Sequence, residues 1–266
     1  MKKIRLDILL VEKGLAPSRE KAQALILAGK VSLNGQVLTK PGYQISPEAD
    51  ISLSEDFPFV SRGGAKLAQA LRTFPISVQG RIALDIGAST GGFTDCLLQF
   101  GARKVYAVDV NTRQLDWKLK QNPNVISIEK NARYLEPSDL PETPDLTVMD
   151  VSFISVLKIL PAIKKVMLAG DLVILIKPQF EAGRDQVGKK GIVREKSVQQ
   201  EVLRRVLTQA QEQGFGLKGL LACETLGQKG NQEFLAWLQA GSPPLDEKAL
   251  ENIIEESFTD GANRKN

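Results

Sequence analysis

Lysines and carboxylates stand beside several strand-like runs of this 266-residue chain. One apolar run ends in Asp150 and another ends in Lys177. Lys66 follows a linker-like segment, and Glu233 precedes the last apolar run. Groups of these types accept protons, orient hydroxyls and stabilise oxyanions. A single Lys or Asp at a strand end is usually only solvated, so it is the set of four that points to chemistry.

The chain contains no histidine, and this limits the reactions open to it. Ser-His-Asp hydrolysis, Cys-His proteolysis and His-ligated metal chemistry are excluded. The two cysteines, Cys96 and Cys223, are too few for a disulfide framework or a multi-cysteine zinc site. An acid–base step must use Lys, Asp, Glu, Tyr or water, and we expect no metal.

A glycine-containing loop at residues 84–93 reads Leu-Asp-Ile-Gly-Ala-Ser-Thr-Gly-Gly-Phe. Glycines let the backbone turn sharply and approach a ligand closely. Asp109 ends the next apolar run, where a carboxylate can accept hydrogen bonds from ribose hydroxyls. This spacing also suits a nicotinamide enzyme. However, Ser89 stands where a Gly-x-Gly-x-x-Gly fingerprint needs its second glycine, which argues against a pyrophosphate there.

Strands and helices alternate from residue 80 onward, which predicts a mainly parallel, doubly wound α/β sheet. The ligands of such sheets bind at the carboxyl ends of the strands, and the four candidate groups are expected to cluster there at strand ends. The predicted strands are Ile82–Ile86, Val105–Val110, Val125–Ile128, Leu146–Asp150, Leu172–Ile176, Leu217–Ala222 and Phe234–Leu238. The predicted helices are Thr94–Phe100, Leu157–Leu168 and Lys196–Gln213.

The first part of the chain has a different pattern. Apolar spacing predicts helices over Arg5–Lys13 and Ser18–Ala28, and an Asn34-Gly35 pair between alternating residues predicts a hairpin. Ser54–Phe59 is typical of a linker. We therefore divide the chain into a small α+β domain at 1–60, a large α/β domain at 61–241, and an acidic C-terminal segment at 242–266.

Charge is unevenly distributed along the chain. The formal net charge is +4 and the pI is about 9.0, yet residues 1–40 alone carry eight basic against three acidic residues. This balance permits a nucleic-acid partner and favours the small domain as the part that anchors it. The expected phosphate contacts are Arg5, Arg19, Lys30 and Lys40, with Arg62 as a further RNA contact.

The sequence also supports predictions for three segments outside the cores of these domains. Residues 182–191, with three glycines and three cations, predict a mobile lid over the ligands, or a plain surface loop. An acidic amphipathic surface helix is expected over 246–258, followed by a loose tail at 259–266. Uncharged apolar stretches such as Leu172–Ile176 are far shorter than the roughly 20 residues of a membrane span. Charges interrupt any signal-peptide core near the start, so we expect a cytoplasmic protein with no membrane partner.

Several of these motifs together resemble a known family. The helix–Gly-Lys-Val–Asn-Gly order of the first region resembles the RNA-binding module shared with the ribosomal protein S4 family, and residues 84–93 resemble motif I of class I S-adenosylmethionine-dependent methyltransferases. The four candidate groups resemble the Lys-Asp-Lys-Glu tetrad of FtsJ-type ribose 2′-O-methyltransferases. Ser-Arg-Gly-Gly-x-Lys-Leu, Asp-Val-Ser-Phe-Ile-Ser, Lys-Pro-Gln-Phe-Glu and Gly-Asn-x-Glu-Phe extend the resemblance, over about residues 3–240, to the TlyA family, whose members are also labelled hemolysin A.

The resemblance implies a class I methyltransferase fold with a seven-stranded sheet, S-adenosylmethionine as cofactor, and a cytidine ribose in 16S or 23S ribosomal RNA, or in both, as the target. It maps the catalytic tetrad onto Lys66, Asp150, Lys177 and Glu233. This chain departs from the family before its last strand, where Cys223-Glu224-Thr225 stands, and Glu224 is therefore a lesser rival for the fourth position. The cofactor contacts are expected at Asp85, Gly87, Ser89, Gly91, Gly92, Asp109, Asn131 and Asp150.

The residues themselves are consistent with this reaction. A ribose hydroxyl is a weak nucleophile, so the enzyme must align oxygen, methyl carbon and sulfur, stabilise the developing alkoxide and accept one proton. Lys177 is the candidate base or alkoxide stabiliser and Lys66 orients the ribose, while Asp150 and Glu233 hold the two lysines. Two alternatives stay open at this point: a non-catalytic RNA-binding module or RNA chaperone, and a hemolysin-type cytolysin. The subunit modified and the oligomeric state do not follow from the sequence.

Overall fold

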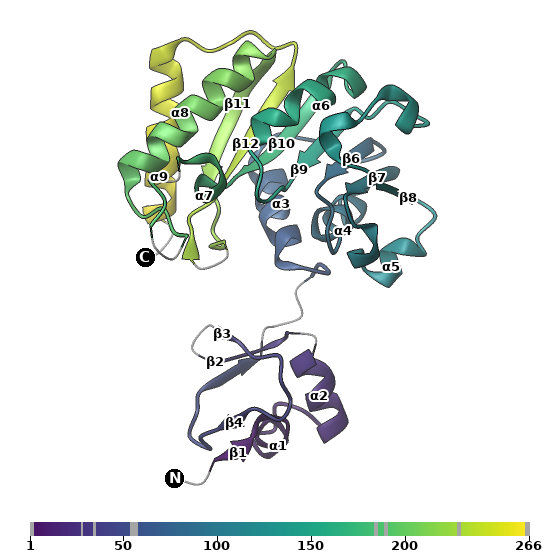
Figure 1. Ribbon diagram of the computed structural model, residues 1–266, viewed down its shortest axis with the longest axis vertical. Coiled ribbons are helices and arrows are strands. Elements are labelled where there is room, and N and C mark those ends of the chain that lie inside the picture. The colour runs from purple at the N-terminus through teal and green to yellow at the C-terminus, as the bar shows by residue number, and fades with distance from the viewer. Residues whose placement is uncertain are drawn as a thin grey trace. The chain divides into compact units, whose positions relative to one another are not determined.

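The computed structural model describes residues 3–27, 29–33, 36–53, 58–183, 186–188, 191–227 and 230–263. The chain forms two compact units, one ending at Pro58 and the other beginning at Phe59, each with its own apolar core (Figure 1). Asn34, Gly35, Arg184, Asp185, Lys189 and Lys190 lie outside the described residues, so the predicted hairpin turn and the charged part of the predicted lid do too. None of the described helices combines the length and apolar character needed to cross a membrane.

The first unit is a small α+β arrangement around the buried side chains of Leu6, Leu10 and Ile26. Ser18 accepts a hydrogen bond from the Lys21 amide and so caps the second helix, as its residue type predicts. The elements are β1 (Ile4–Arg5), α1 (Leu6–Glu12), α2 (Arg19–Leu27), β2 (Val31–Leu33), β3 (Gln36–Val37), β4 (Gln44–Ile45) and β5 (Ile51–Leu53). β2 pairs antiparallel with β3 and β5, and β1 pairs antiparallel with β4.

The second unit is a seven-stranded sheet in the order β11-β12-β10-β9-β6-β7-β8. Its strands are β6 (Ile82–Ile86), β7 (Lys104–Asp109), β8 (Val125–Glu129), β9 (Leu146–Met149), β10 (Gly170–Ile176), β11 (Phe215–Ala222) and β12 (Phe234–Ala240). The five strands from β10 to β8 run parallel, while β12 is antiparallel to both of its neighbours. The predicted mainly parallel α/β fold, with a small α+β part before it, is confirmed.

Helices cover both faces of this sheet (Figure 1). One face packs against α6 (Leu160–Val166), α8 (Lys196–Glu212) and α9 (Glu247–Asn263), and the other against α3 (Arg62–Thr73) and α4 (Gly92–Gln99). Short turns of helix complete the unit: η1 (Thr112–Gln114), α5 (Trp117–Lys120), η2 (Ala132–Tyr134), η3 (Pro137–Asp139), η4 (Val156–Lys158) and α7 (Pro178–Glu181). The helix predicted as continuous over 157–168 is therefore divided between η4 and α6.

Two predictions about local structure were wrong. Residues 259–263 belong to helix α9 rather than to a loose tail. The helix is anchored there because Phe258 stacks on Phe234 and Ile254 is fully buried. In addition, Lys66 lies on helix α3 and not at a strand end, because the segment after the linker is an amphipathic helix with Leu67 and Leu71 buried. The sequence pattern around residue 66 had not been used to predict a helix.

Candidate active site

The glycine loop between β6 and α4 passes directly over the end of β9. Gly87 has a φ of +81°, and a Cβ there would collide with the carbonyl oxygen of Asp150. A residue with a side chain would thus be both strained and excluded. The order β9-β6 places these two strand ends side by side at the switch point of the sheet, where doubly wound folds bind ligands.

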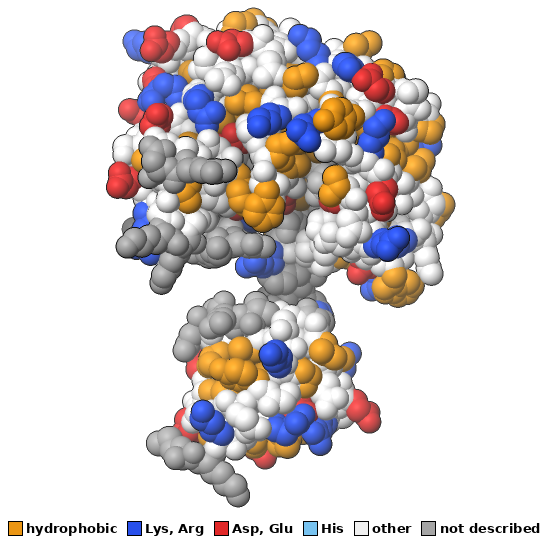
Figure 2. Space-filling view, in the orientation of Figure 1, with side chains coloured by type: hydrophobic (Ala, Val, Ile, Leu, Met, Phe, Trp, Pro, Cys, Tyr) orange, Lys and Arg blue, Asp and Glu red, His pale blue; other side chains and the backbone are white. Residues whose placement is uncertain are grey.

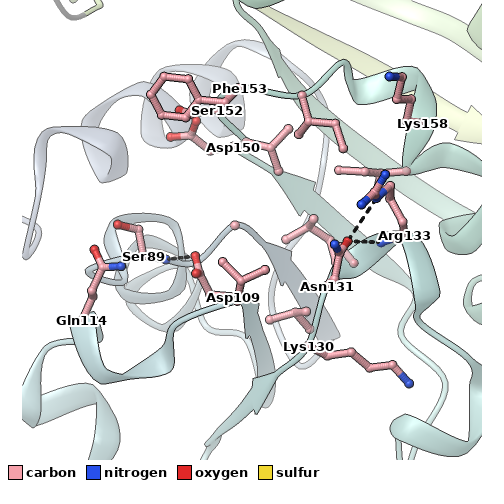
Figure 3. A pocket seen from close by; sticks show the side chains of 18 residues that line it. Ser89, Asp109, Gln114, Lys130, Asn131, Arg133, Asp150, Ser152, Phe153 and Lys158 are labelled. Atoms are coloured by element: carbon pink, nitrogen blue, oxygen red, sulfur yellow. Dashed lines mark hydrogen bonds between the residues drawn. The ribbon is translucent and has the colours of Figure 1, made fainter.

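Asp109, at the end of β7, holds the same loop through its carboxylate (Figure 3). One oxygen accepts a hydrogen bond from the Ser89 amide at 2.9 Å, and the other accepts from the Asn111 amide at 2.9 Å. A carboxylate has about four acceptor sites, so both oxygens can still accept from a ligand hydroxyl. A cavity of about 710 Å³ opens here, and Gly87, Ser89, Asp109 and Asp150 are among its lining residues.

Most of the other expected cofactor contacts lie at the cavities or in the glycine loop, but one is buried away from them. Asn131 also lines this cavity, and its side-chain oxygen accepts a hydrogen bond from the Arg133 amide, which fixes the turn after β8 (Figure 3). Gly92 lines a neighbouring cavity of about 200 Å³, and Gly91 is the left-handed residue that precedes α4. Asp85, in contrast, is fully buried beneath α4 and is not among the residues that line these cavities.

Asp85 is a buried carboxyl with little to offset the loss of water. The Thr94 hydroxyl donates to one of its oxygens at 2.6 Å, while the other oxygen has no hydrogen-bond partner. Burial raises the pKa of Asp85 to about 7. The structure therefore places this residue under the glycine loop, where it supports the start of α4.

Two lysine–carboxylate pairs form the centre of the site. Lys66 Nζ lies 2.5 Å from Glu233 Oε2, and Lys177 Nζ lies 2.6 Å from Asp150 Oδ1. Lys177 also donates a hydrogen bond to the Ser152 hydroxyl at 3.0 Å. The lysine side chains are only 10% and 12% exposed. All four residues line one cavity of about 360 Å³, whereas Glu224 is an exposed residue outside that lining.

The fold explains how residues 167 positions apart in the sequence come to pair. Because β12 runs antiparallel to β10, with Phe234 opposite Ile176, Glu233 lies at the same sheet edge as Lys177. Lys66 is supplied by α3, and the first turn of α3 packs tightly on the start of α4. Side chains at Gly64 and Gly92 would each collide with the start of the facing helix. The Ser-Arg-Gly-Gly segment thus permits the approach that places Lys66 beside Glu233.

Asp150 and Ser152 connect the cofactor side of the site with the lysine side. Both residues line the 710 Å³, the 200 Å³ and the 360 Å³ cavities. A group bound over the glycine loop and a group bound between the lysines would therefore meet at the end of β9. This arrangement suits a transfer between two bound molecules.

Further residues of the site were quoted within motifs but were given no role from the sequence. Gln179 donates a hydrogen bond to Glu233 Oε1 at 3.1 Å, so it shares that carboxylate with Lys66. Glu181 is buried and accepts from the Val156 amide at 2.8 Å, which fixes the loop after Asp150, and burial raises its pKa. The spacing of the Lys-Pro-Gln-Phe-Glu motif was the available signal.

Among the described residues, Phe153 has the most exposed large apolar side chain, at 90%, and it has a positive φ of 65°. Its ring lies 4.9 Å from that of Phe180, centroid to centroid, and lines the lysine cavity. An unfavourable backbone conformation combined with an exposed aromatic ring is typical of a functional position.

The residues predicted to contact RNA lie in both units. Arg62 lines the lysine cavity of the second unit. Arg5 and Arg19 lie in the first unit, where both pair with the buried carboxylate of Asp7. Lys40 is exposed beside the turn that precedes β4, and Lys30 precedes β2. Figure 2 shows basic side chains on the face of the smaller unit, with acidic ones near its edges, and both kinds interspersed over the larger unit.

Comparison with known proteins agrees with this geometry. Residues 59–240 match the FtsJ-like methyltransferase family, and residues 4–51 match the S4 domain. The chain is 40% identical to the 16S/23S rRNA (cytidine-2'-O)-methyltransferase TlyA of Mycobacterium tuberculosis, with 98% of this chain and 99% of the relative covered. It is 44% identical to Hemolysin A of Brachyspira hyodysenteriae, with 88% and 98% covered.

Among solved structures, a protein from Streptococcus thermophilus is 44% identical and superposes with a TM-score of 0.76, covering 100% of this chain and 99% of that one. A second protein, from Lactococcus lactis, is 42% identical with a TM-score of 0.71, covering 76% of this chain and 100% of that one. The chain belongs to the TlyA/hemolysin A family of FtsJ-like, S-adenosylmethionine-dependent methyltransferases, with an S4 domain ahead of the catalytic domain.

Proposed function

We propose that this protein methylates the 2′-hydroxyl of a cytidine in ribosomal RNA, using S-adenosylmethionine as the methyl donor. The observation that carries the proposal is the meeting of one buried and one half-buried lysine–carboxylate pair with the glycine-loop cavity at Asp150. The cytidine and the ribosomal RNA follow from the relatives, of which one acts on 16S/23S rRNA and another, from Campylobacter jejuni and 32% identical, on 23S rRNA. Because ribosomes are cytoplasmic, the reaction belongs there.

The residues around the larger cavity fit the proposed cofactor. Asp109 would accept hydrogen bonds from the ribose hydroxyls of the cofactor, and Asn131 would lie near the base of the cofactor. Gly87 has no side chain and would allow the cofactor to approach the backbone of the glycine loop closely. When bound, S-adenosylmethionine supplies a methyl group already activated by its sulfonium charge. The protein's own task is then to place the acceptor and to handle one proton.

The lysine cavity supplies that placement. Lys177 lies between Asp150 and Ser152 at the junction of the cavities, so its ammonium can stabilise the oxyanion of a ribose hydroxyl and its amine form can accept the proton. Lys66 is held by Glu233, and Glu233 is held in turn by Gln179. This fixed cation would orient the ribose, because misplacement by about 1 Å costs on the order of 100-fold in rate.

Phe153 offers a surface for the base of the target nucleotide. Its exposed ring beside the lysine cavity can stack on a base that has left a helix, and base–aromatic stacking contributes about 1–3 kcal/mol. Glu181 holds the loop that carries this ring through the Val156 amide. The loop between β9 and α6 would therefore hold both the acceptor ribose and its base.

The direct test is transfer of a labelled methyl group to purified 30S and 50S subunits and to the 16S and 23S RNAs. Methylation that maps to a cytidine 2′-oxygen supports the proposal. RNA binding with no transfer in any of these substrates would instead support a non-catalytic RNA-binding module. Methylation of a base or of a protein would contradict the assignment of the lysine cavity to a ribose.

A further inference from the structure

One acidic side chain lies at the centre of the basic first unit, and it is completely buried. Asp7, in helix α1, is 0% exposed. Its Oδ1 accepts a hydrogen bond from Arg5 Nε at 3.0 Å. Its Oδ2 accepts from Arg5 Nη2 at 3.0 Å, from Arg19 Nε at 3.0 Å and from Gln23 Nε2 at 2.8 Å. These hydrogen bonds, above all the one from Arg5, hold the pKa of Asp7 well below its usual range.

The two arginines turn only part of each guanidinium toward this carboxylate. Arg5 uses Nε and Nη2, and Arg19 uses Nε. Within the described part of the chain, Arg5 Nη1 and both Nη atoms of Arg19 make no hydrogen bond to protein. The side chains are 40% and 54% exposed, so the protein covers each guanidinium only in part. An arginine held through its Nε edge keeps donors that match a phosphate.

The turn before β4 restricts Arg5 further. The Leu6 and Asp7 amides donate to the carbonyls of Tyr43 and Pro41, which ties this turn to the start of α1. A Cβ at Gly42 would lie 3.2 Å from Arg5 Nη1, so the turn packs against the guanidinium. The direction of the Arg5 side chain is therefore set on two sides, by Asp7 and by the turn.

Charge alone does not explain an acid at this place. Asp7 cancels one of the two positive charges beside it, which weakens a purely electrostatic attraction to RNA. What the carboxylate supplies is order: it fixes two long side chains whose immobilisation otherwise opposes binding. The buried position would keep the carboxylate away from a phosphate bound at the arginines.

We propose that Asp7 is a positioning residue that fixes Arg5 and Arg19 as a pair of outward guanidinium edges for the phosphate backbone of ribosomal RNA. The inference rests on the proposed function, which supplies the RNA. It makes a prediction opposite in sign to that of charge alone, because neutralising Asp7 adds one positive charge to a basic domain.

The experiment compares Asp7→Asn with Glu20→Gln in the full chain. Both variants gain the same charge, but Glu20 is exposed on α2, and among the described residues it is Asp7, not Glu20, that forms the ion pairs with the two arginines. An asparagine at position 7 keeps one acceptor oxygen but turns amide hydrogens toward the arginine donors that the other oxygen held, so it holds the two side chains less firmly. We expect Asp7→Asn to weaken binding of 23S and 16S transcripts about tenfold, with a smaller salt dependence between roughly 50 and 200 mM salt. Glu20→Gln should bind equally or more tightly.

The outcomes separate the explanations. Equal or tighter binding by Asp7→Asn would overturn the inference, because charge would then suffice. Hydrogen exchange over residues 3–53 shows whether the unit still folds. If Asp7→Asn unfolds the first unit, the Arg19→Lys variant is used instead. This variant keeps the positive charge but loses the planar guanidinium. Weaker RNA binding by Arg19→Lys supports the inference, and unchanged binding overturns it. A wild-type chain that binds neither RNA would instead overturn the proposed function, and the inference with it.

Discussion

The two units both pair cations with carboxylates, but only the second unit encloses the cations as well. In the first unit the acid, Asp7, is fully buried, and the arginines it holds are 40% and 54% exposed. In the second unit the cations themselves are buried, with Lys66 10% and Lys177 12% exposed in a cavity beside their acids.

This difference matches two different tasks. An exposed guanidinium edge meets a phosphate on the outside of a folded RNA without removing it from water. A lysine in a cavity acts only on a group brought to it, where water is excluded and electrostatic interactions are stronger. The first arrangement suits docking and the second suits chemistry, and substitutions should separate the two.

The largest effect is expected at Lys177. Lys177→Ala removes the group placed to accept or neutralise the ribose proton, which typically reduces the rate by roughly 10²–10⁴-fold. Lys177→Arg should not restore it, because a guanidinium keeps its proton at any accessible pH. Single-turnover methyl transfer with saturating RNA measures this, and calorimetry checks cofactor affinity separately. Near-normal transfer by Lys177→Arg would show that the residue acts only as a fixed cation.

A smaller loss is expected at Lys66, which we assign to orientation. Lys66→Ala should reduce single-turnover transfer by about 100-fold through misplacement of the ribose. Glu233→Gln should be milder, because the amide oxygen still accepts the hydrogen bond from Lys66 and only the charge is lost. The ordering of the two rates is the decisive measurement. A Glu233→Gln variant slower than Lys66→Ala would mean that the carboxylate acts on the substrate directly.

How much of this site followed from the sequence depends on the kind of contact. The positions of Asp150 and Lys177 at the ends of β9 and β10 were predictable, because the apolar runs stop at these residues and parallel strands end at the same edge of a sheet. The Lys66–Glu233 pair needed the antiparallel β12 and the close packing of α3 on α4, and the pattern around residue 66 had not been assigned to a helix.

Long-range hydrogen bonds could not be predicted from the sequence for a similar reason. The roles of Gln179 and Glu181 depend on which strand neighbours which, since each bonds a residue at least 25 positions away. In the first unit, Arg5 and Arg19 were identified by charge, but the buried Asp7 between them was counted only as an opposing charge. Burial of the acid reverses that interpretation, and composition carries no information about burial.

The cofactor side of the second unit is tested at Asp109. Asp109→Ala removes one hydrogen bond to the glycine loop, at Ser89, and one to the Asn111 amide, together with the proposed ribose contact. We expect cofactor affinity to fall by roughly tenfold to a hundredfold, which corresponds to about 1.5–3 kcal/mol. Isothermal calorimetry with S-adenosylmethionine measures the change. Unaltered affinity would remove Asp109 from the cofactor site.

The docking side is tested by the cations themselves. Replacing Arg19 and Lys40 together with Ala should weaken binding of different ribosomal RNA fragments by similar factors. The slope of log affinity against log salt should fall by about one for each lost phosphate contact. Filter binding over a salt series, with cofactor affinity as the control, gives both numbers. An unchanged salt slope would mean that the first unit binds some other partner.

The last effect is on stability rather than on activity, and it concerns the two buried aspartates, which differ in their partners. Arginines hold the pKa of Asp7 low, whereas burial with only Thr94 beside it raises the pKa of Asp85 to about 7. In the unfolded chain an aspartate titrates near about pH 4. Between these values the folded chain binds a proton that the unfolded chain lacks, so stability falls as pH rises from about 4 to about 7 and then levels off.

Asp85→Asn removes this titration and keeps an acceptor for the Thr94 hydroxyl. The free energy of unfolding of the variant, relative to the wild type, should therefore rise across that pH window. Both tryptophans, Trp117 and Trp237, lie in the second unit, so fluorescence in denaturant follows that unit alone. A difference that stays constant from about pH 4 to about pH 8 would show that Asp85 is ionised in the folded state. Its surroundings would then compensate a buried charge as fully as the arginines do for Asp7.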